Sequence, residues 1–381
     1  MNNSTIVKID FKIIDSLRGL AALYVCIAHC RGALWIGGNE FIKLHPYSSW
    51  NIKDWLIMFT MSLTKLSGEA VIFFFVLSGF SIAHSLTYQP KPTTFFYKRF
   101  IRLYPPYILG LVIAIIVVYI LKTSPDIFFS GKYDTLLFQK ITASLVLITP
   151  VGIIKTLLYC PDITTIIGPY WSLVYEVIFY IGAIIFLRSL KSYYILSCLF
   201  FVAGYFTENI IPSYITSLSV FQFVFEYNFF FMAGVYVYHN IDKIITWKFI
   251  VNKYWSIICI GLYVVMILLE SKIEFEYNIC FLLSTVTCII MITNMLSKKI
   301  YIKPFIEIGK FSYTLYVTHF PIVILIAYTL FIYFHVTPPY FYSFCFWIPA
   351  VLICLILARV FYFLIEERTK KYLDLIRRNR D

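Results

Sequence analysis

Long apolar runs recur along the whole chain and are separated by shorter polar stretches. Most runs are about 18 residues long, close to the length that an α-helix needs to cross the hydrocarbon core of a membrane. The chain is therefore expected to be an all-α polytopic membrane protein, a transmembrane helix bundle with about ten spanning helices. The pattern predicts spans near residues 13–31, 69–88, 103–121, 170–188, 193–207, 219–239, 254–270, 277–296, 313–335 and 343–365.

An eleventh apolar segment, residues 141–159, is interrupted by Pro150 and Gly152. Lys and Arg concentrate in cytoplasmic loops, so loop charge indicates whether this segment crosses. With the N-terminus inside and ten crossings, the basic loop SKKIYIKPFIEIGK and the basic tail lie inside, and the acidic loop ESKIEFE lies outside. An eleventh crossing would turn the later basic loops outward. We therefore expect 141–159 to be re-entrant or interfacial and both termini to be cytoplasmic.

Composition agrees with a membrane protein, because 60% of the 381 residues are hydrophobic and 14% are charged, whereas soluble domains are about 25% charged. The net charge of +12 invites a nucleic-acid interpretation. The basic residues lie in short loops between apolar runs, however, as the positive-inside rule predicts. We expect membrane lipid and no nucleic acid as partners, and one membrane domain over residues 1–381 without an appended soluble domain.

The nine cysteines are scattered, and nearly all lie within apolar runs. They form no C-x-x-C pair and show no metal-ligand spacing. The sequence therefore predicts small buried apolar side chains, with no metal site and no disulfide framework.

The first span, IDSLRGLAALYVCIAH, contains Asp15, Arg18 and His29. Asp15 and Arg18 are three residues apart and share a helix face. His29 follows Arg18 by about three full turns, so it returns to that face about 16 Å further along the axis. Charge inside a membrane is costly and usually marks a functional path. An Asp–Arg pair that only fixes the bundle, with a hydrogen-bonded core His, is the alternative.

The loop YKRFIRLYPPY places Arg99 and Arg102 on one helix face, and Pro105 and Pro106 suit the start of the next span. Guanidinium groups match phosphate oxygens, so this pair is a candidate phosphate clamp. Cytoplasmic topology signals are the alternative.

Glu176 lies in the apolar span WSLVYEVIFY, which also holds Trp171 and Ser172 at its start. The predicted topology places Glu176 about 9 Å in from the outer end of its helix, at a depth where it can meet His29. A structural hydrogen bond is the alternative.

Two further segments carry polar groups inside apolar runs. In SYTLYVTHFP, His319 follows the hydroxyls of Tyr313 and Tyr316; in FFFVLSGF, Ser78 precedes Gly79. Ser78 has no G-x-S-x-G elbow around it, which argues against a serine hydrolase. Gly79 can admit a close backbone or a ligand. We regard these residues as substrate-binding or structural.

Taken in order, the five segments DSLRGLAALYVCIAH, FFFVLSGF, KRFIRLYP, WSLVYEVIFY and SYTLYVTHFP closely resemble the bacterial integral-membrane O-acyltransferases, the third acyltransferase family. The resemblance extends from residue 14 to about residue 367. It implies a multi-pass protein of the bacterial cytoplasmic membrane that transfers an acyl group, usually acetyl, from cytoplasmic acetyl-CoA to a hydroxyl of an exported or surface glycan. It implies acetyl-CoA as a co-substrate, a glycan or lipid-linked saccharide as acceptor, and no permanently bound cofactor.

On this interpretation His29 is the general base on the acceptor hydroxyl, with an acyl-His intermediate as a variant. Glu176 orients His29, Asp15 orients Arg18 at the donor entry, and Arg99 with Arg102 holds the CoA phosphates. A transporter or flippase for a glycan or lipid-linked substrate is the alternative, because intramembrane charges suit that class as well. An oligomer is possible, but nothing in the sequence supports one.

Overall fold

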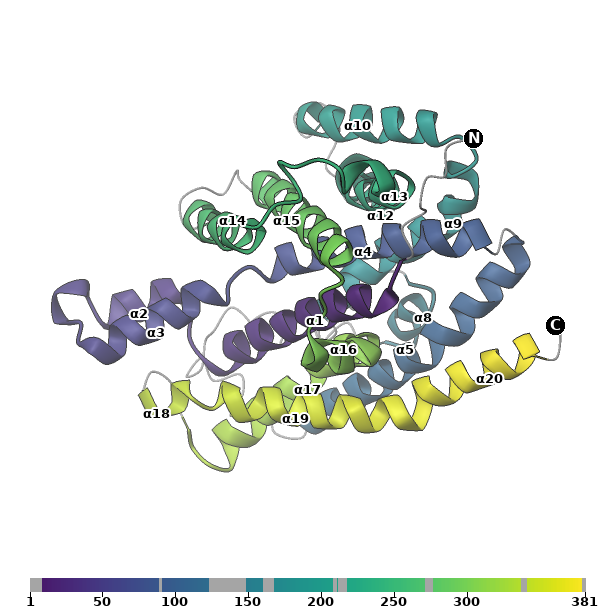
Figure 1. Ribbon diagram of the computed structural model, residues 1–381. Helices are drawn as coiled ribbons and strands as arrows, with labels where there is room; N and C mark the ends of the chain where they lie inside the picture. The colour runs from purple at the N-terminus through teal and green to yellow at the C-terminus, as the bar shows by residue number, and fades with distance from the viewer. Residues whose placement is uncertain are drawn as a thin grey trace. The chain divides into compact units, whose positions relative to one another are not determined.

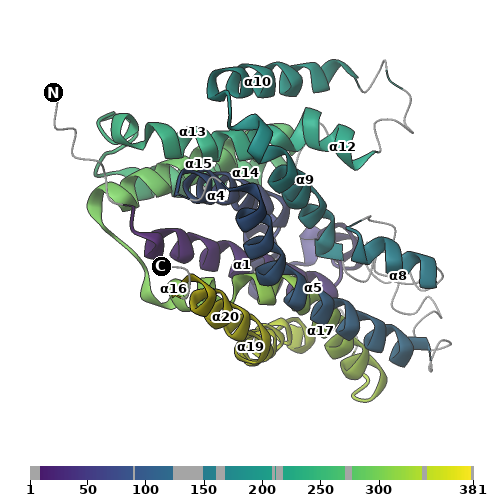
Figure 2. The ribbon, with the colours of Figure 1, turned by 90° about the vertical axis from the view of Figure 1, so that its right-hand side faces the viewer.

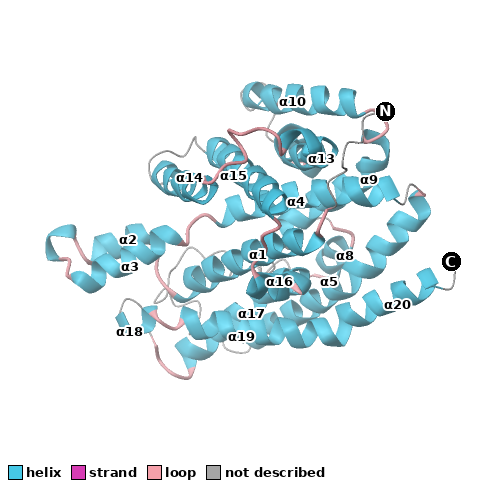
Figure 3. Ribbon diagram, viewed as in Figure 1, coloured by secondary structure: helices cyan, strands magenta, loops and turns pink. Residues whose placement is uncertain are grey.

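The computed structural model describes residues 9–88, 91–122, 149–159, 168–207, 211, 218–270, 277–336 and 341–378. Within these ranges every regular element is a helix and none is a strand (Figure 3). The predicted all-α class is confirmed.

Eight helical runs in the described residues are long and apolar enough to cross a membrane. Each of them overlaps one of the predicted spans, and several extend well beyond it. The other two predicted spans, 193–207 and 254–270, correspond to the shorter apolar helices Leu190–Gly204 and Trp255–Glu270. The chain is thus a multi-pass membrane protein, while ten crossings and cytoplasmic termini stay predictions. The eight runs are Phe11–Leu44, Ile52–Tyr88, Pro92–Lys122, Gly168–Phe186, Ser219–Ile244, Ile279–Lys298, Ser312–Phe331 and Trp347–Leu373.

The chain divides into two compact units, each assembled from distant segments. The first unit comprises Met1–Ala21, Gly68–Lys98 and Ser172–Lys310. The second unit comprises Ala22–Ser67, Arg99–Trp171 and Phe311–Asp381. Helix α1, Phe11–Leu34, begins in the first unit and continues into the second.

The first unit is a layered set of helices in which α13 and α14 each pack on α15 (Figure 1). Besides the first half of α1 it contains α4 (Ser67–Tyr88), α9 (Trp171–Phe186), α10 (Leu190–Thr207), α12 (Ser219–Gln222), the π-helical turn Phe223–Tyr227, α13 (Asn228–Ile244), α14 (Trp255–Glu270), α15 (Tyr277–Lys298) and α16 (Lys303–Lys310).

Two glycines let α4 and α13 cross at backbone contact. A Cβ atom on Gly79 of α4 would overlap the carbonyl oxygen of Phe231, and one on Gly234 of α13 would overlap that of Val76. Small residues allow such close approach between membrane helices. Gly79 therefore admits a backbone, one of the two uses expected for it.

In the second unit α17 and α19 lie side by side (Figure 2). Besides the second half of α1 the unit contains α2 (Gly38–Leu44), a 3-10 turn (Tyr47–Ser49), α3 (Ile52–Leu63), most of α5 (Pro92–Lys122), α8 (Pro150–Leu157), a second 3-10 turn (Gly168–Tyr170), α17 (Ser312–Ile332), α18 (Phe341–Phe344), α19 (Trp347–Phe361), the π-helical turn Tyr362–Glu366 and α20 (Glu367–Arg378).

Helix α5 does not start at the proline pair. It begins at Pro92 and carries Pro105 and Pro106 within it. The expectation that these prolines open a span was wrong, because Pro92 already takes the first-turn position that proline favours. Each internal proline removes one backbone hydrogen bond, and the helix continues through the loss.

The segment 141–159 is described only from residue 149, and residues 141–148 lie outside the described part. Within it, α8 is eight residues long, which gives a length of about 12 Å against a hydrocarbon core of about 30 Å. Helix α8 is too short to cross, and the re-entrant or interfacial placement of the whole segment stays a prediction.

Candidate functional site

His29 lies in the part of α1 that belongs to the second unit, and it meets His319 of α17. Its Nδ1 atom is 2.8 Å from Nε2 of His319, and the two rings are nearly parallel, at 7°. The ring of Phe320 meets the ring of His29 edge-on. His319 is 1% exposed, whereas His29 is only partly buried. One imidazole is thus enclosed and the other remains partly accessible.

The direction of this hydrogen bond follows from the second partner of His319. Its Nδ1 atom lies 2.8 Å from the carbonyl oxygen of Leu315, which can only accept, so Nδ1 carries a proton. Nε2 of neutral His319 is then an acceptor, and His29 donates to it from Nδ1. This tautomer of His29 carries its lone pair on Nε2. That atom can accept a proton.

Tyrosine hydroxyls fix α17 beside this pair. Tyr316 donates to the carbonyl oxygen of Pro169 at 2.8 Å. Tyr170 lies 3.1 Å from the carbonyl oxygen of Val317, to which its hydroxyl donates. Both bonds tie the turn before α9 to the stretch of α17 that presents His319. Tyr316 therefore positions the backbone in this structure, and Tyr170 is a positioning residue that sequence reasoning missed.

In the first unit, Arg18 donates from Nη2 to Oγ of Ser81 on α4, at 3.1 Å. The same stretch of α1 is pressed against α16: a Cβ atom on Gly19 would overlap the carbonyl oxygen of Phe305, and one on Gly309 would overlap that of Asp15. Gly19 and Gly309 therefore let α1 and α16 approach to backbone contact. The hydrogen bond from Arg18 is thus accepted by a residue of α4, Ser81. The orienting role of Asp15 stays a prediction.

Glu176 of α9 is also in the first unit and lies partly buried. Its Oε1 atom accepts a hydrogen bond from Oγ of Ser78, at 3.0 Å, and another from the hydroxyl of Tyr180. Ser78 is thus a carboxylate partner, which sequence reasoning did not foresee. The expected pairing of Glu176 with His29 concerns both units and stays a prediction.

Arg99 and Arg102, expected in a loop before the span 103–121, lie inside α5 instead. Arg99 and Arg102 share one face of α5, and both are partly buried. Ser172 is buried, whereas Trp171 and Tyr313 are partly buried. The binding roles of these residues stay predictions.

Sequence reasoning missed two buried clusters. Glu366 is 1% exposed; it accepts from Thr314 at 2.6 Å and pairs with Lys370 at 2.8 Å. The spacing of Glu366 and Lys370, four residues apart, was a readable signal for the ion pair. The other cluster consists of the three cysteines Cys26, Cys30 and Cys354. Two of them, also four residues apart in the first span, could have been noticed.

A protein-family model described as an acyltransferase domain matches residues 11–359. The match begins with the first residue of α1, ends within α19 and runs through both units. It includes all five motifs that carry the resemblance. No curated protein and no solved structure matches the chain. Because the model covers far more than half of the sequence, the chain belongs to the third acyltransferase family.

Proposed function

We propose that this protein transfers an acyl group, most readily acetyl, from cytoplasmic acyl-CoA to a hydroxyl of an exported or cell-surface glycan. The observation that supports this best is the directed pair of hydrogen bonds from His29 through His319 to the carbonyl oxygen of Leu315. It leaves Nε2 of His29 as a proton acceptor. A hydroxyl is a weak nucleophile at neutral pH and needs such a base.

In the proposed reaction, Nε2 of His29 removes the proton of the acceptor hydroxyl while its oxygen attacks the thioester carbonyl. The C–S bond breaks, and the CoA thiolate takes up the proton that His29 has gained. His319 accepts from Nδ1 of His29 throughout, so it holds the ring and polarises it. This is the part that an Asp plays in a catalytic triad, here with a neutral partner.

A variant of the reaction uses Nε2 of His29 as the nucleophile, giving an acyl-imidazole that the hydroxyl then attacks. The two routes differ when the acceptor is withheld. Labelled acyl-CoA then marks the protein only if the acyl group passes through His29. Label retained on the wild-type chain and absent from His29→Ala would establish the variant.

The donor end is assigned to Arg99 and Arg102, whose charges would hold the CoA phosphates, with Arg18 and Asp15 at the entry. A charge-assisted hydrogen bond is worth about 1.5–3 kcal/mol, so Arg99→Ala should raise KM for the donor about 10- to 100-fold. KM for the acceptor should stay unchanged. Arg368→Ala removes an exposed cation from α20 and serves as the control. Equal effects on both substrates would refute the phosphate clamp.

Trp171, Ser172 and Tyr313 are proposed as substrate-binding or structural residues on the acceptor path. The bacterial cytoplasmic membrane is the proposed location, because the donor is cytoplasmic and the acceptor is exported. Acyl-CoA is a co-substrate on this proposal, and no cofactor is assigned.

The test incubates membranes that contain the protein with radiolabelled acetyl-CoA, and then extracts and hydrolyses the glycans. An acyltransferase leaves alkali-labile acetate on the glycan, in proportion to time and protein. Matched membranes without the protein should leave none. A transporter or flippase would move glycan across the membrane with no acetyl label, and that result would reject the proposal.

A further inference from the structure

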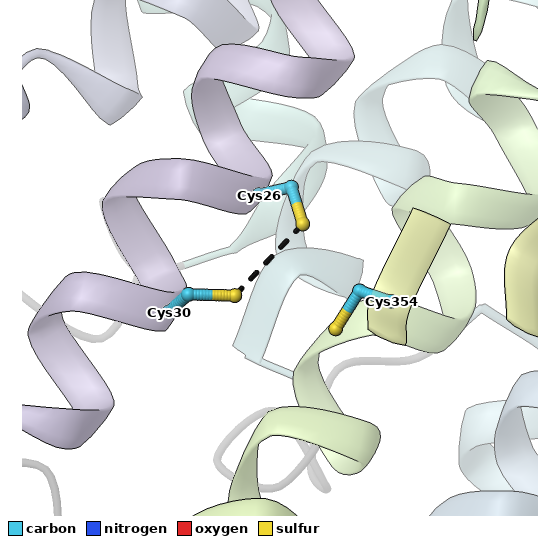
Figure 4. Close-up of side chains that lie close together, drawn as sticks. All are labelled: Cys26, Cys30 and Cys354. Carbon is cyan, nitrogen blue, oxygen red and sulfur yellow. Dashed lines mark hydrogen bonds between the residues drawn. The ribbon is translucent and has the colours of Figure 1, made fainter. Parts of the chain in front are cut away.

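Three cysteines of the second unit converge in its interior. Cys26 and Cys30 come from α1, and Cys354 comes from α19 (Figure 4). Their Sγ atoms all lie within 4.8 Å of one another, and each residue is 0% exposed. We propose that these three side chains form a thiolate site for a zinc ion.

The spacing on α1 suits a metal site. Residues four apart face the same way from a helix, and pairs at this spacing supply two ligands in helical zinc motifs. The Sγ atoms of Cys26 and Cys30 are 3.9 Å apart. Two thiolates on one tetrahedral zinc, with Zn–S bonds of about 2.3 Å, lie about 3.8 Å apart. The pair on α1 already has this separation.

The third ligand needs only a small movement. Cys354 lies within 4.8 Å of both other sulfurs, so a shift of about 1 Å or less brings all three to the separation that zinc requires. A small change in the χ1 angle of Cys354, within one staggered rotamer, moves its Sγ atom by this distance. The sulfurs are too far apart for a disulfide, in which the S–S distance is about 2.05 Å.

Other buried cysteines of the chain behave differently. Cys280 and Cys288 each place Sγ against one backbone carbonyl, of Met266 and Phe73 respectively. Cys354 makes a carbonyl contact of the same kind, with His319, but its Sγ atom also lies within 4.8 Å of the Sγ atoms of Cys26 and Cys30. The three sulfurs come together from two helices, α1 and α19, that are more than 300 residues apart in the chain.

The ligand set points to zinc among the thiophilic cations. Soft thiolates select Zn²⁺ and Cu⁺. Three thiolates leave a single net negative charge with Zn²⁺ and a double one with Cu⁺, and the smaller charge costs less in an apolar interior. The thiol protons are released to solvent when the metal binds. The three cysteines supply three of the four ligands that zinc prefers.

A bound zinc would tie α1 to α19 beside the histidine pair. Cys30 directly follows His29, and Sγ of Cys354 lies 3.8 Å from the carbonyl oxygen of His319. The site therefore holds both helices next to the two imidazoles without touching a reacting atom. Its metal is structural, and its loss should lower the thermal stability of the protein.

The test uses the full-length protein purified in detergent, stripped with a chelator and titrated with Zn²⁺. We expect about one zinc per chain by elemental mass spectrometry, as for a structural site, and a higher Tm with the metal than without it. Titration of the wild-type protein with Co²⁺ should give a thiolate-to-cobalt charge-transfer band whose intensity corresponds to three sulfur ligands.

Cys354→Ala should lose the zinc and the Tm increase, and Cys30→Ala should do the same. Cys288→Ala, at a buried cysteine of the first unit, should keep both. Helical circular dichroism and a single gel-filtration peak verify that each variant is folded. Wild-type protein that binds no Zn²⁺, binds Cu⁺ alone, or shows no thiolate–cobalt band would overturn the proposal. Equal zinc contents in Cys354→Ala and Cys288→Ala would overturn it as well.

Discussion

Glu176 of the first unit and the histidine pair of the second unit are both polar groups inside apolar helices, and they differ in where their hydrogen bonds end. At Glu176 the bonds end on a carboxylate, which receives the hydroxyls of Ser78 and Tyr180. At the histidine pair they start at His29 and end on a backbone carbonyl, that of Leu315. A carboxylate that collects donors is satisfied. A histidine that donates from one ring nitrogen keeps a lone pair on the other.

The carboxylate and the histidine pair therefore use buried polar groups in different ways. An acceptor shared by hydroxyls on α4 and α9 fixes those helices, because losing it would leave the buried hydroxyl of Ser78 without its acceptor. A directed pair of imidazoles fixes a tautomer, which matters only if a proton is to be moved. We therefore expect acyl transfer to depend more on the histidine pair of the second unit, and folding to depend more on Glu176 of the first unit.

The largest effect should follow His29→Ala. The substitution removes the only proposed base, and a positioned His contributes about 10²–10⁴-fold, so turnover should fall by about that factor. Initial rates of acetyl transfer in membranes, normalised to protein inserted, measure it. Thermal stability should change little, because His29 is partly exposed and His319 keeps its bond to Leu315.

A matched control removes another imidazole. His335 is exposed and has a φ of 52°, a conformation that Asn tolerates. His335→Asn should therefore transfer acetyl at the wild-type rate. If His29→Ala transferred acetyl at the wild-type rate, His29 would not be the base, and its contrast with Glu176 would fail.

The next effect tests the direction of the imidazole pair. His319→Ala removes the acceptor that holds Nδ1 of His29, and a hydrogen bond to a group that becomes charged is worth about 1.5–3 kcal/mol. We expect kcat to fall about 10- to 100-fold with KM for either substrate unchanged.

His319→Gln sharpens that test, because its amide oxygen can take the place of Nε2 as an acceptor. Gln should recover a large part of the kcat that Ala loses. If Gln and Ala were equally inactive, His319 would serve packing alone, and the orientation of His29 would need another source.

The sequence was most informative about the lengths of the helices and about which residues share a helix face. The helices were readable because long apolar runs have few other ways to be buried, and the placement of Asp15, Arg18 and His29 on one helix followed from its period. The start of α5 was not readable, since Pro92 and Pro105 both suit a first turn and only the folded chain decides between them.

The sequence did not predict which side chains from distant parts of the chain meet in the fold. His29 and His319 are 290 residues apart, and no local pattern states that α17 lies against α1. Depth alone suggested Glu176 as the partner of His29, because a carboxylate is the familiar companion of a catalytic imidazole. The same limit applies to Cys354: the pair on α1 is visible as a spacing, whereas the third sulfur comes from tertiary packing.

The smallest effect on turnover should follow Glu176→Gln, and it decides between the two roles of that residue. The amide oxygen of Gln still accepts from Ser78 and Tyr180, so a structural carboxylate can be replaced with less than about a tenfold loss of rate. Glu176→Ala removes the acceptor of the buried Ser78 hydroxyl and should destabilise the protein by about 1–3 kcal/mol. Thermal unfolding in detergent measures the second effect, and acetyl transfer measures the first. Should Glu176→Gln lose as much activity as His29→Ala while unfolding at the wild-type temperature, the negative charge itself would be catalytic. Glu176 would then regain the orienting role that the sequence suggested, and the first unit could no longer be regarded as the structural half of the comparison.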